Sequence, residues 1–200
     1  DEVVELYSVL ASDSSPVRLN PALIPGGDVV HCAISPDGRT VAYVADQLVD
    51  NRFELFRVPI DGSAPALRLN GNLISGGDVA TVHNTYELLF SPDSARVLYV
   101  ADALANERFE LFSVLTTGGT PPVRLNPQLG QTGDVGGALA SWTSLALTLD
   151  GARVVFLANP SDAFRHLYVA PIDGATPAAV LLAPAPQANL DRLLLDDDGA

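Results

Sequence analysis

Short runs of hydrophobic and β-branched residues alternate with turn residues along the whole chain. Pro36-Asp37-Gly38 and Asp61-Gly62 are strong turn signals, and each of them stands between two such runs. No window shows the helical period of about 3.6 residues, so we expect little helix. In one representative stretch the pattern predicts four strands, at residues 29–34, 40–45, 53–60 and 66–69.

The second of these runs, Val41-Ala42-Tyr43-Val44-Ala45, is apolar at every position. A strand with one face in water alternates apolar and polar residues, whereas a strand buried on both faces does not. We therefore predict that this strand lies inside the protein and is covered on both sides.

Three short motifs return in the same order along the chain, so the sequence has an internal repeat. A four-stranded unit repeated about every 50 residues is typical of the blades of a β-propeller. A two-sheet sandwich would have similar strand spacing but not this period. The motifs are Glu-Leu-aromatic at Glu5, Glu54 and Glu110 (looser at His166), Arg-Leu-Asn at Arg18, Arg68 and Arg124, and Gly-Asp-Val at Asp28, Asp78 and Asp134.

The fold class predicted from these patterns is all-β, a propeller built from four-stranded antiparallel blades. The repeats resemble the TolB-type, WD-repeat-like propeller family of bacterial envelope and secreted proteins. Two copies of the family motif carry the resemblance: Ser35-Pro36-Asp37-Gly38 with Glu54-Leu55-Phe56, and Ser91-Pro92-Asp93-Ser94 with Glu110-Leu111-Phe112. The third copy departs from it, with Thr148-Leu149 in place of Ser-Pro. The motif is specific for fold and unspecific for function.

We expect three complete blades flanked by two partial ones. Either the chain is a segment of a longer propeller, or the partial ends close a four-blade ring, or another chain completes the circle. Because the chain starts at Asp1 without a charged, apolar leader, we also expect a removed signal peptide or an internal piece of a longer protein. The units are a partial blade at 1–20, blades at 28–70, 78–126 and 134–183, and a partial blade at 190–200.

Charge and composition limit which classes of partner the protein can bind. The formal net charge is −13, and all 11 Lys or Arg positions are arginine. An acidic surface repels phosphate backbones, so nucleic acid is a poor partner, and no apolar run approaches the roughly 18 residues that cross a bilayer. The lone Cys32 cannot form an internal disulfide, and it lies in an apolar run where a free thiol usually behaves as a small hydrophobe.

The repeated Asp28, Asp78 and Asp134 have two interpretations. They could form a ring of metal-binding or catalytic carboxylates, or each could cap backbone N–H groups in a tight turn. Repetition at equivalent positions favours capping, because a single site seldom needs the same residue in every repeat.

Metal and catalytic signals are weak. Asp46, Asp50 and Asn51 have the oxygen ligands that calcium prefers, but their spacing does not match an EF-hand loop. The three histidines have no zinc-ligand spacing, and no Gly-x-Ser-x-Gly nucleophile elbow is present. We therefore predict no cofactor, no resident metal and no catalytic residues in this chain.

Extra residues at 80–85 and 136–144 precede the first strands of two units, where they would fall on a loop face. We predict a partner-binding surface there, with candidate residues His83, Asn84, Ser141, Trp142 and Thr143. The leading hypothesis is a non-enzymatic module for protein–protein interaction. The family resemblance implies a periplasmic or extracellular location. The rival hypothesis is a propeller that accompanies or gates a hydrolase, such as a peptidase, whose catalytic part lies outside these residues.

Overall fold

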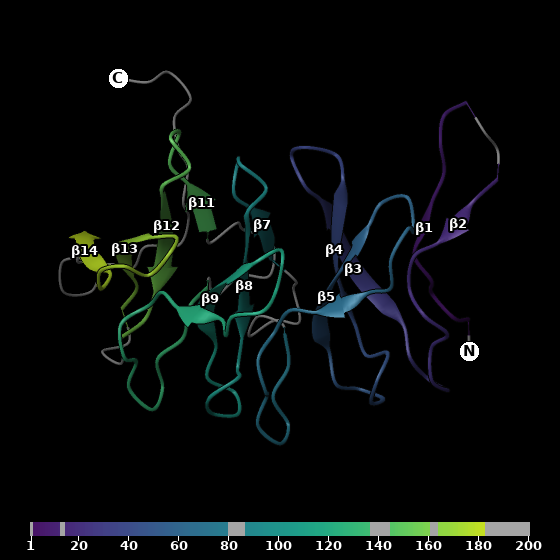
Figure 1. The fold of residues 1–200 in the computed structure, drawn as a ribbon. Helices are drawn as coiled ribbons and strands as arrows, with labels where there is room; N and C mark the ends of the chain where they lie inside the picture. The colour runs from purple at the N-terminus through teal and green to yellow at the C-terminus, as the bar shows by residue number, and fades with distance from the viewer. Residues whose placement is uncertain (1, 13–14, 80–86, 137–144, 161–163, 183–200) are drawn as a thin grey trace.

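A computed structural model describes residues 2–12, 15–79, 87–136, 145–160 and 164–182. Within these ranges the regular structure is entirely β, in three four-stranded sheets and one two-stranded sheet that stand in a row (Figure 1). The two-stranded sheet contains β1 (Tyr7–Ser8) and β2 (Val17–Arg18). The four-stranded sheets contain β3 (Val29–Ile34), β4 (Thr40–Ala45), β5 (Glu54–Pro59) and β6 (Leu67–Arg68); β7 (Leu88–Phe90), β8 (Arg96–Ala101), β9 (Glu110–Leu115) and β10 (Val123–Arg124); and β11 (Leu145–Leu147), β12 (Arg153–Ala158), β13 (His166–Pro171) and β14 (Ala179–Leu182).

In every four-stranded sheet each strand pairs antiparallel with the next strand of the chain, so each sheet is a simple meander. Such connections need only short hairpin turns, which the Pro, Asp and Gly positions supply. The prediction of an all-β protein built from four-stranded antiparallel units is confirmed.

The second strand of each four-stranded sheet is buried on both faces, as predicted from its unbroken apolar run. In β4, Val41, Tyr43 and Ala45 pack in a cluster with Leu19 of the preceding sheet. The alternating Ala42 and Val44 pack in another cluster with residues of β8. Successive side chains of a strand point to opposite faces, so the strand contributes to two cores at once.

The cores therefore lie between the sheets. One cluster joins β1–β2 to the sheet of β3–β6, the next joins that sheet to β7–β10, and the third joins β7–β10 to β11–β14. An isolated sheet of this kind could not bury both of its faces.

A stacked aromatic pair recurs at the same position of each four-stranded sheet, between its second and third strands. Such a pair contributes about 0.5–1.5 kcal/mol beyond the burial of its area. The pairs are Tyr43 with Phe56 at 5.4 Å, Tyr99 with Phe112 at 5.6 Å and Phe156 with Tyr168 at 5.5 Å between ring centroids.

The turn between the first and second strands is held by one hydroxyl and one carboxylate. Ser35 Oγ donates to Asp37 Oδ1, which also accepts the Arg39 N–H. These bonds favour the ionised carboxylate and hold the pKa of Asp37 below its ordinary value. In the third sheet Thr148 donates to Asp150 in the same way, so the departure from Ser-Pro leaves the turn intact.

Candidate functional site

The hairpins that follow β4 and β8 lie on the same side of the row of sheets, the lower side in Figure 1. The Gly-Asp turns that lead from one sheet to the next lie at the same end, because Asp46 and Asp102 at the starts of these hairpins accept N–H bonds from Asp28 and Asp78. We call this end, comprising residues 24–28, 46–53, 74–78, 102–109 and 130–134, the loop end.

The repeated aspartates of the loop end tie each sheet to the one before it. Each Oδ1 accepts a backbone N–H of the preceding sheet. For Asp78 and Asp134 the donor directly precedes the third strand of that sheet, and for Asp28 the donor is Val4, which stands before β1. The aspartates do cap backbone N–H groups, as the capping interpretation predicted. The capped N–H is not in the same turn, however, but lies 24 or 25 residues earlier in the chain. The bonds run from Val4 to Asp28 at 2.7 Å, from Phe53 to Asp78 at 2.7 Å and from Phe109 to Asp134 at 2.9 Å.

Burial perturbs two of these carboxyl groups. Desolvation raises the pKa of Asp78 and of Asp134 above the ordinary value of 3.8, against the lowering effect of the N–H bond that each accepts. The negative charge of Asp102 raises the pKa of Asp78 further. Desolvation by burial also raises the pKa of carboxyl groups with a purely structural role, so the shift by itself assigns no catalytic role to Asp78 or Asp134.

The calcium candidates lie together in the β4–β5 hairpin. Asp46 Oδ1 accepts the Asp28 N–H at 2.6 Å, and Asp46 Oδ2 accepts the Asn51 N–H at 2.9 Å. The Asp50 carboxylate packs against Gly26, where an added Cβ would lie 2.7 Å from Asp50 Oδ1. Among the described residues there is no group of three or more His, Cys, Asp or Glu side chains arranged to hold a metal ion. Asp46 thus ties the β4–β5 hairpin to the Gly-Asp turn before β3, and Asp50 packs against the same turn.

The loop end also exposes apolar side chains. Leu48 and Val49 at the tip of the β4–β5 hairpin are 52% and 50% exposed, and Leu104 at the tip of the β8–β9 hairpin is 52% exposed. Leu48 and Leu104 occupy equivalent positions of two neighbouring sheets, because Asp46 and Asp102 begin the two hairpins. These hairpin tips were not predicted from the sequence, although apolar residues inside a hairpin turn are a visible signal.

The predicted partner-binding residues His83, Asn84, Ser141, Trp142 and Thr143 lie outside the described residues. The residues just before both inserts are described. Val79 donates its N–H to Phe53 O, and Val135 donates to Phe109 O, both at 2.8 Å. The described chain therefore lies beside the loop end just before each insert.

No protein-family model matches the sequence, and no curated protein matches it significantly. Solved structures do resemble it in fold. A protein assigned as TolB from Agrobacterium tumefaciens superposes with a TM-score of 0.55 at 18% identity, over 92% of this chain and 57% of that one. TolB from Acinetobacter baumannii superposes with a TM-score of 0.53 at 14% identity, over 88% of this chain and 37% of that one.

A prolyl endopeptidase structure superposes with a TM-score of 0.54 at 13% identity, over 90% of this chain and 26% of that one. The chain thus spans about half of the length of the first protein and less than half of the other two. Identities this low establish the fold alone. The chain has a TolB-like β-propeller fold, and the sheets of the row are propeller blades.

Proposed function

We propose that the chain is a non-enzymatic propeller module that binds a protein partner through its loop end. The observation that carries the proposal is the pair of exposed leucines, Leu48 and Leu104, at equivalent hairpin tips of adjacent blades. Large exposed apolar side chains that gather on one face, with polar groups around them, mark interaction surfaces.

Hydrogen bonds within and between the blades hold these hairpin tips in place. Each hairpin is closed by an aspartate with both carboxylate oxygens bonded, and adjacent blades are joined by the Asp78 bond to Phe53. A partner therefore meets side chains that are already positioned, which lowers the entropic cost of binding. We extend the proposed surface to the two inserts, with His83, Asn84, Ser141, Trp142 and Thr143 as contributing residues.

The location proposed for this activity is the bacterial periplasm or the outside of the cell, supported by the likeness to TolB structures. Within the described residues no helix is long and apolar enough to span a membrane. We propose no nucleic-acid partner, because the net charge of −13 opposes one.

The rival function is that of a propeller which accompanies a hydrolase, and the likeness to a prolyl endopeptidase keeps it open. The two proposals differ in what the loop end does. A binding module retains a partner there, whereas a gating propeller would limit which substrates pass to a separate catalytic part.

The test is affinity capture from a bacterial envelope extract with quantitative mass spectrometry, comparing the wild type with a double variant carrying Leu48→Asp and Leu104→Asp. We expect the double variant to lose at least one partner about tenfold, since charging a desolvated contact costs more than about 1.4 kcal/mol. The matched control is Leu149→Asp, which changes an exposed leucine in a turn at the opposite end of the blades. Equal recovery of every captured protein by all three forms would contradict the proposal.

A further inference from the structure

The two hairpins of the loop end belong to blades that have a neighbour on each side. The sheet of β3–β6 packs between β1–β2 and β7–β10, and the sheet of β7–β10 packs between β3–β6 and β11–β14. Both hairpins nevertheless expose apolar side chains, Leu48 and Val49 at one tip and Leu104 at the other. Their exposure is therefore a property of complete blades, and both tips face the same side of the row (Figure 1).

Each apolar tip stands beside an exposed carboxylate. Asp50 follows Leu48 by two residues, and Glu107 follows Leu104 by three. Both acidic residues are exposed, and among the described residues neither makes an ion pair. Two adjacent blades therefore present the same combination, a large aliphatic side chain and an unpaired negative charge.

The arginines of the loop end act at the junctions between blades and not at the tips. Arg52 and Arg108 are half-buried, and Arg52 donates from Nη2 to the Leu73 C=O at 3.2 Å. Burial raises the pKa of Asp78 and of Asp134, and the positive charges of Arg52 and Arg108 oppose this rise. The exposed charge of the loop end is therefore negative.

The negative charges of the loop end also repel one another. Its residues include seven acidic side chains and two arginines. After burial, the charge of Glu107 is a further cause that raises the pKa of both Asp78 and Asp134, and the charge of Asp102 does the same to Asp78. A cationic partner relieves this repulsion, whereas an anionic partner adds to it.

We propose that the loop end binds a segment of a partner protein in which large apolar residues are flanked by lysine or arginine. The apolar residues of the segment pack on Leu48 and Leu104, and its cations pair with Asp50 and Glu107. This inference rests on the proposed function, because it names the chemistry of the partner that the loop end binds.

Two other occupants fit the loop end less well. A second copy of this chain carries the same net charge of −13, so the two copies repel each other. Its 11 arginines stand at least five residues apart along the sequence, so it offers no segment with neighbouring bases. A membrane surface with anionic lipids is repelled by the exposed acidic residues.

The probes are three synthetic peptides of equal length, built from leucine and lysine, from leucine and glutamate, and from serine and lysine. Fluorescence anisotropy measures their affinity for the protein. We expect the leucine–lysine peptide to bind at least about tenfold more tightly than either of the others, because it alone supplies both apolar and cationic contacts. Raising the ionic strength from about 0.1 M to about 1 M, which shortens the screening length from about 10 Å to about 3 Å, should weaken its binding at least about threefold.

The double variant Asp50→Asn with Glu107→Gln removes both exposed charges and nearly keeps the side-chain shapes. We expect it to slow association of the leucine–lysine peptide at least about threefold, because exposed charges act mainly on the association rate. The matched control is Asp61→Asn with Asp173→Asn, which removes two exposed charges from hairpins at the opposite end of the blades and keeps their acceptor oxygens. The control should change the rate less than about twofold, since the lost charges lie beyond the screening length.

Four results would overturn this inference. They are no binding of the leucine–lysine peptide, equal binding of the leucine–lysine and leucine–glutamate peptides, an unchanged association rate in the loop-end variant, and equal slowing in the control variant. The peptide comparison uses the wild type, so it holds even where a variant does not fold. These results leave the proposed function intact as long as capture of a partner depends on Leu48 and Leu104. Capture that is indifferent to both leucines contradicts the proposed function instead, whichever peptide binds.

Discussion

At the scale of single residues, one carboxylate per repeat joins consecutive blades. Asp78 Oδ1 accepts the Phe53 N–H, and the Phe53 C=O accepts the Val79 N–H in return. An N–H that loses its partner inside the protein costs about 1–3 kcal/mol, so these bonds matter to the stability of the row.

The charge and the acceptor oxygen of Asp78 have separable effects. Its pKa is raised in the folded state, so the stability linked to this group is fully present below 3.8 and is lost as pH rises through the raised value. Asp78→Asn keeps an acceptor oxygen and removes the titration. We therefore expect Asp78→Asn to gain stability relative to the wild type as pH rises through that window, and to show no such gain below it.

Asp78→Ala removes the acceptor as well, and we expect it to lose about 1–3 kcal/mol across the whole pH range. Urea unfolding of the three proteins from pH 3 to pH 7 measures both effects. An Asp78→Asn curve parallel to the wild type at every pH would show that desolvation of this carboxyl does not affect stability.

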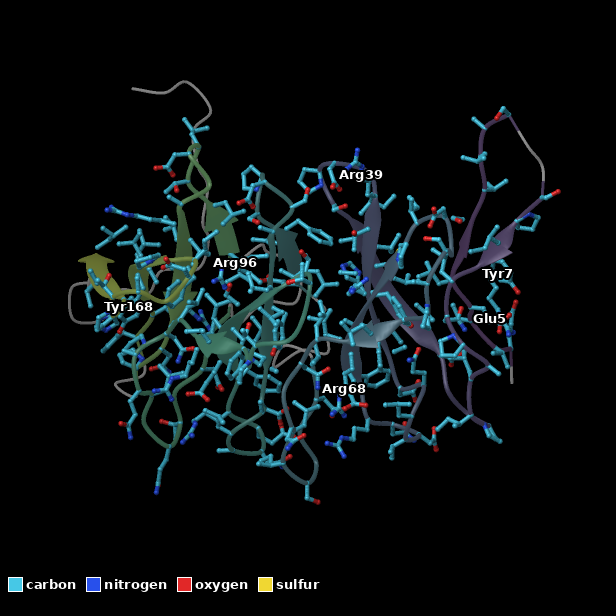
Figure 2. The ribbon with its side chains drawn as sticks, in the orientation of Figure 1. Glu5, Tyr7, Arg39, Arg68, Arg96 and Tyr168 are labelled. Carbon is cyan, nitrogen blue, oxygen red and sulfur yellow. The ribbon has the colours of Figure 1, made fainter. Side chains whose placement is uncertain are left out.

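At the scale of the strand pair, an Arg–Glu ion pair links the fourth strand to the third in three successive units. Its burial changes from unit to unit. The exposed fractions of the Arg and Glu side chains are 44% and 22% for Arg18–Glu5, 39% and 2% for Arg68–Glu54, and 34% and 0% for Arg124–Glu110. Figure 2 shows Arg68 and Glu5 in their separate blades.

Replacing the arginine of this pair with methionine should therefore lower the free energy of unfolding by different amounts in different units. Arg124→Met leaves the buried Glu110 carboxylate without its cation, and we expect a loss of about 3 kcal/mol. Arg18→Met breaks a solvated pair, which should cost less than about 1 kcal/mol. Thermal or urea unfolding at neutral pH compares the two variants directly, and equal losses would mean that the burial of the glutamate does not set the strength of the pair.

At the scale of the whole molecule, close approach between blades constrains the hairpin that joins each third strand to its fourth. Gly174 has a φ of +69°, and an added Cβ would lie 2.3 Å from Val123 Cγ1 of the preceding blade. Gly62 and Gly118 make the corresponding approaches to Val17 and Leu67. Glycine at this position therefore permits both the turn and the stacking of blades.

Gly38 shows the effect of the left-handed backbone without the close approach between blades. It has the same φ of +69° as Gly174, but nothing lies within 4 Å of an added Cβ. Gly38→Ala should cost about 1–2 kcal/mol, from the left-handed backbone alone. Gly174→Ala should cost about 1–3 kcal/mol more, because Val123 is stiff at χ1 and cannot easily move aside. Chemical denaturation of both variants tests this difference, and its absence would show that the blades separate slightly at little cost.

The sequence by itself determined the features that depend on neighbours along the chain. Alternation and turn residues predicted the four-stranded meander, and the unbroken apolar run predicted that β4 is buried on both faces. The internal repeat predicted that the units stack. These signals are local or periodic, so they can be seen without coordinates.

Only the tertiary structure decided what each repeated residue touches. The aspartates at 28, 78 and 134 look like residues that cap their own turns, but their partners belong to the blade before. Glu-Leu-aromatic is nearly the same motif at Glu5 and Glu54, yet Tyr7 is exposed and Phe56 is buried. Cys32 is exposed despite its apolar run, and it lines a cavity of about 250 Å³ together with Leu6 and Ile34. Burial and hydrogen bonding depend on which sheet lies alongside, and the order of residues within one repeat does not contain that information.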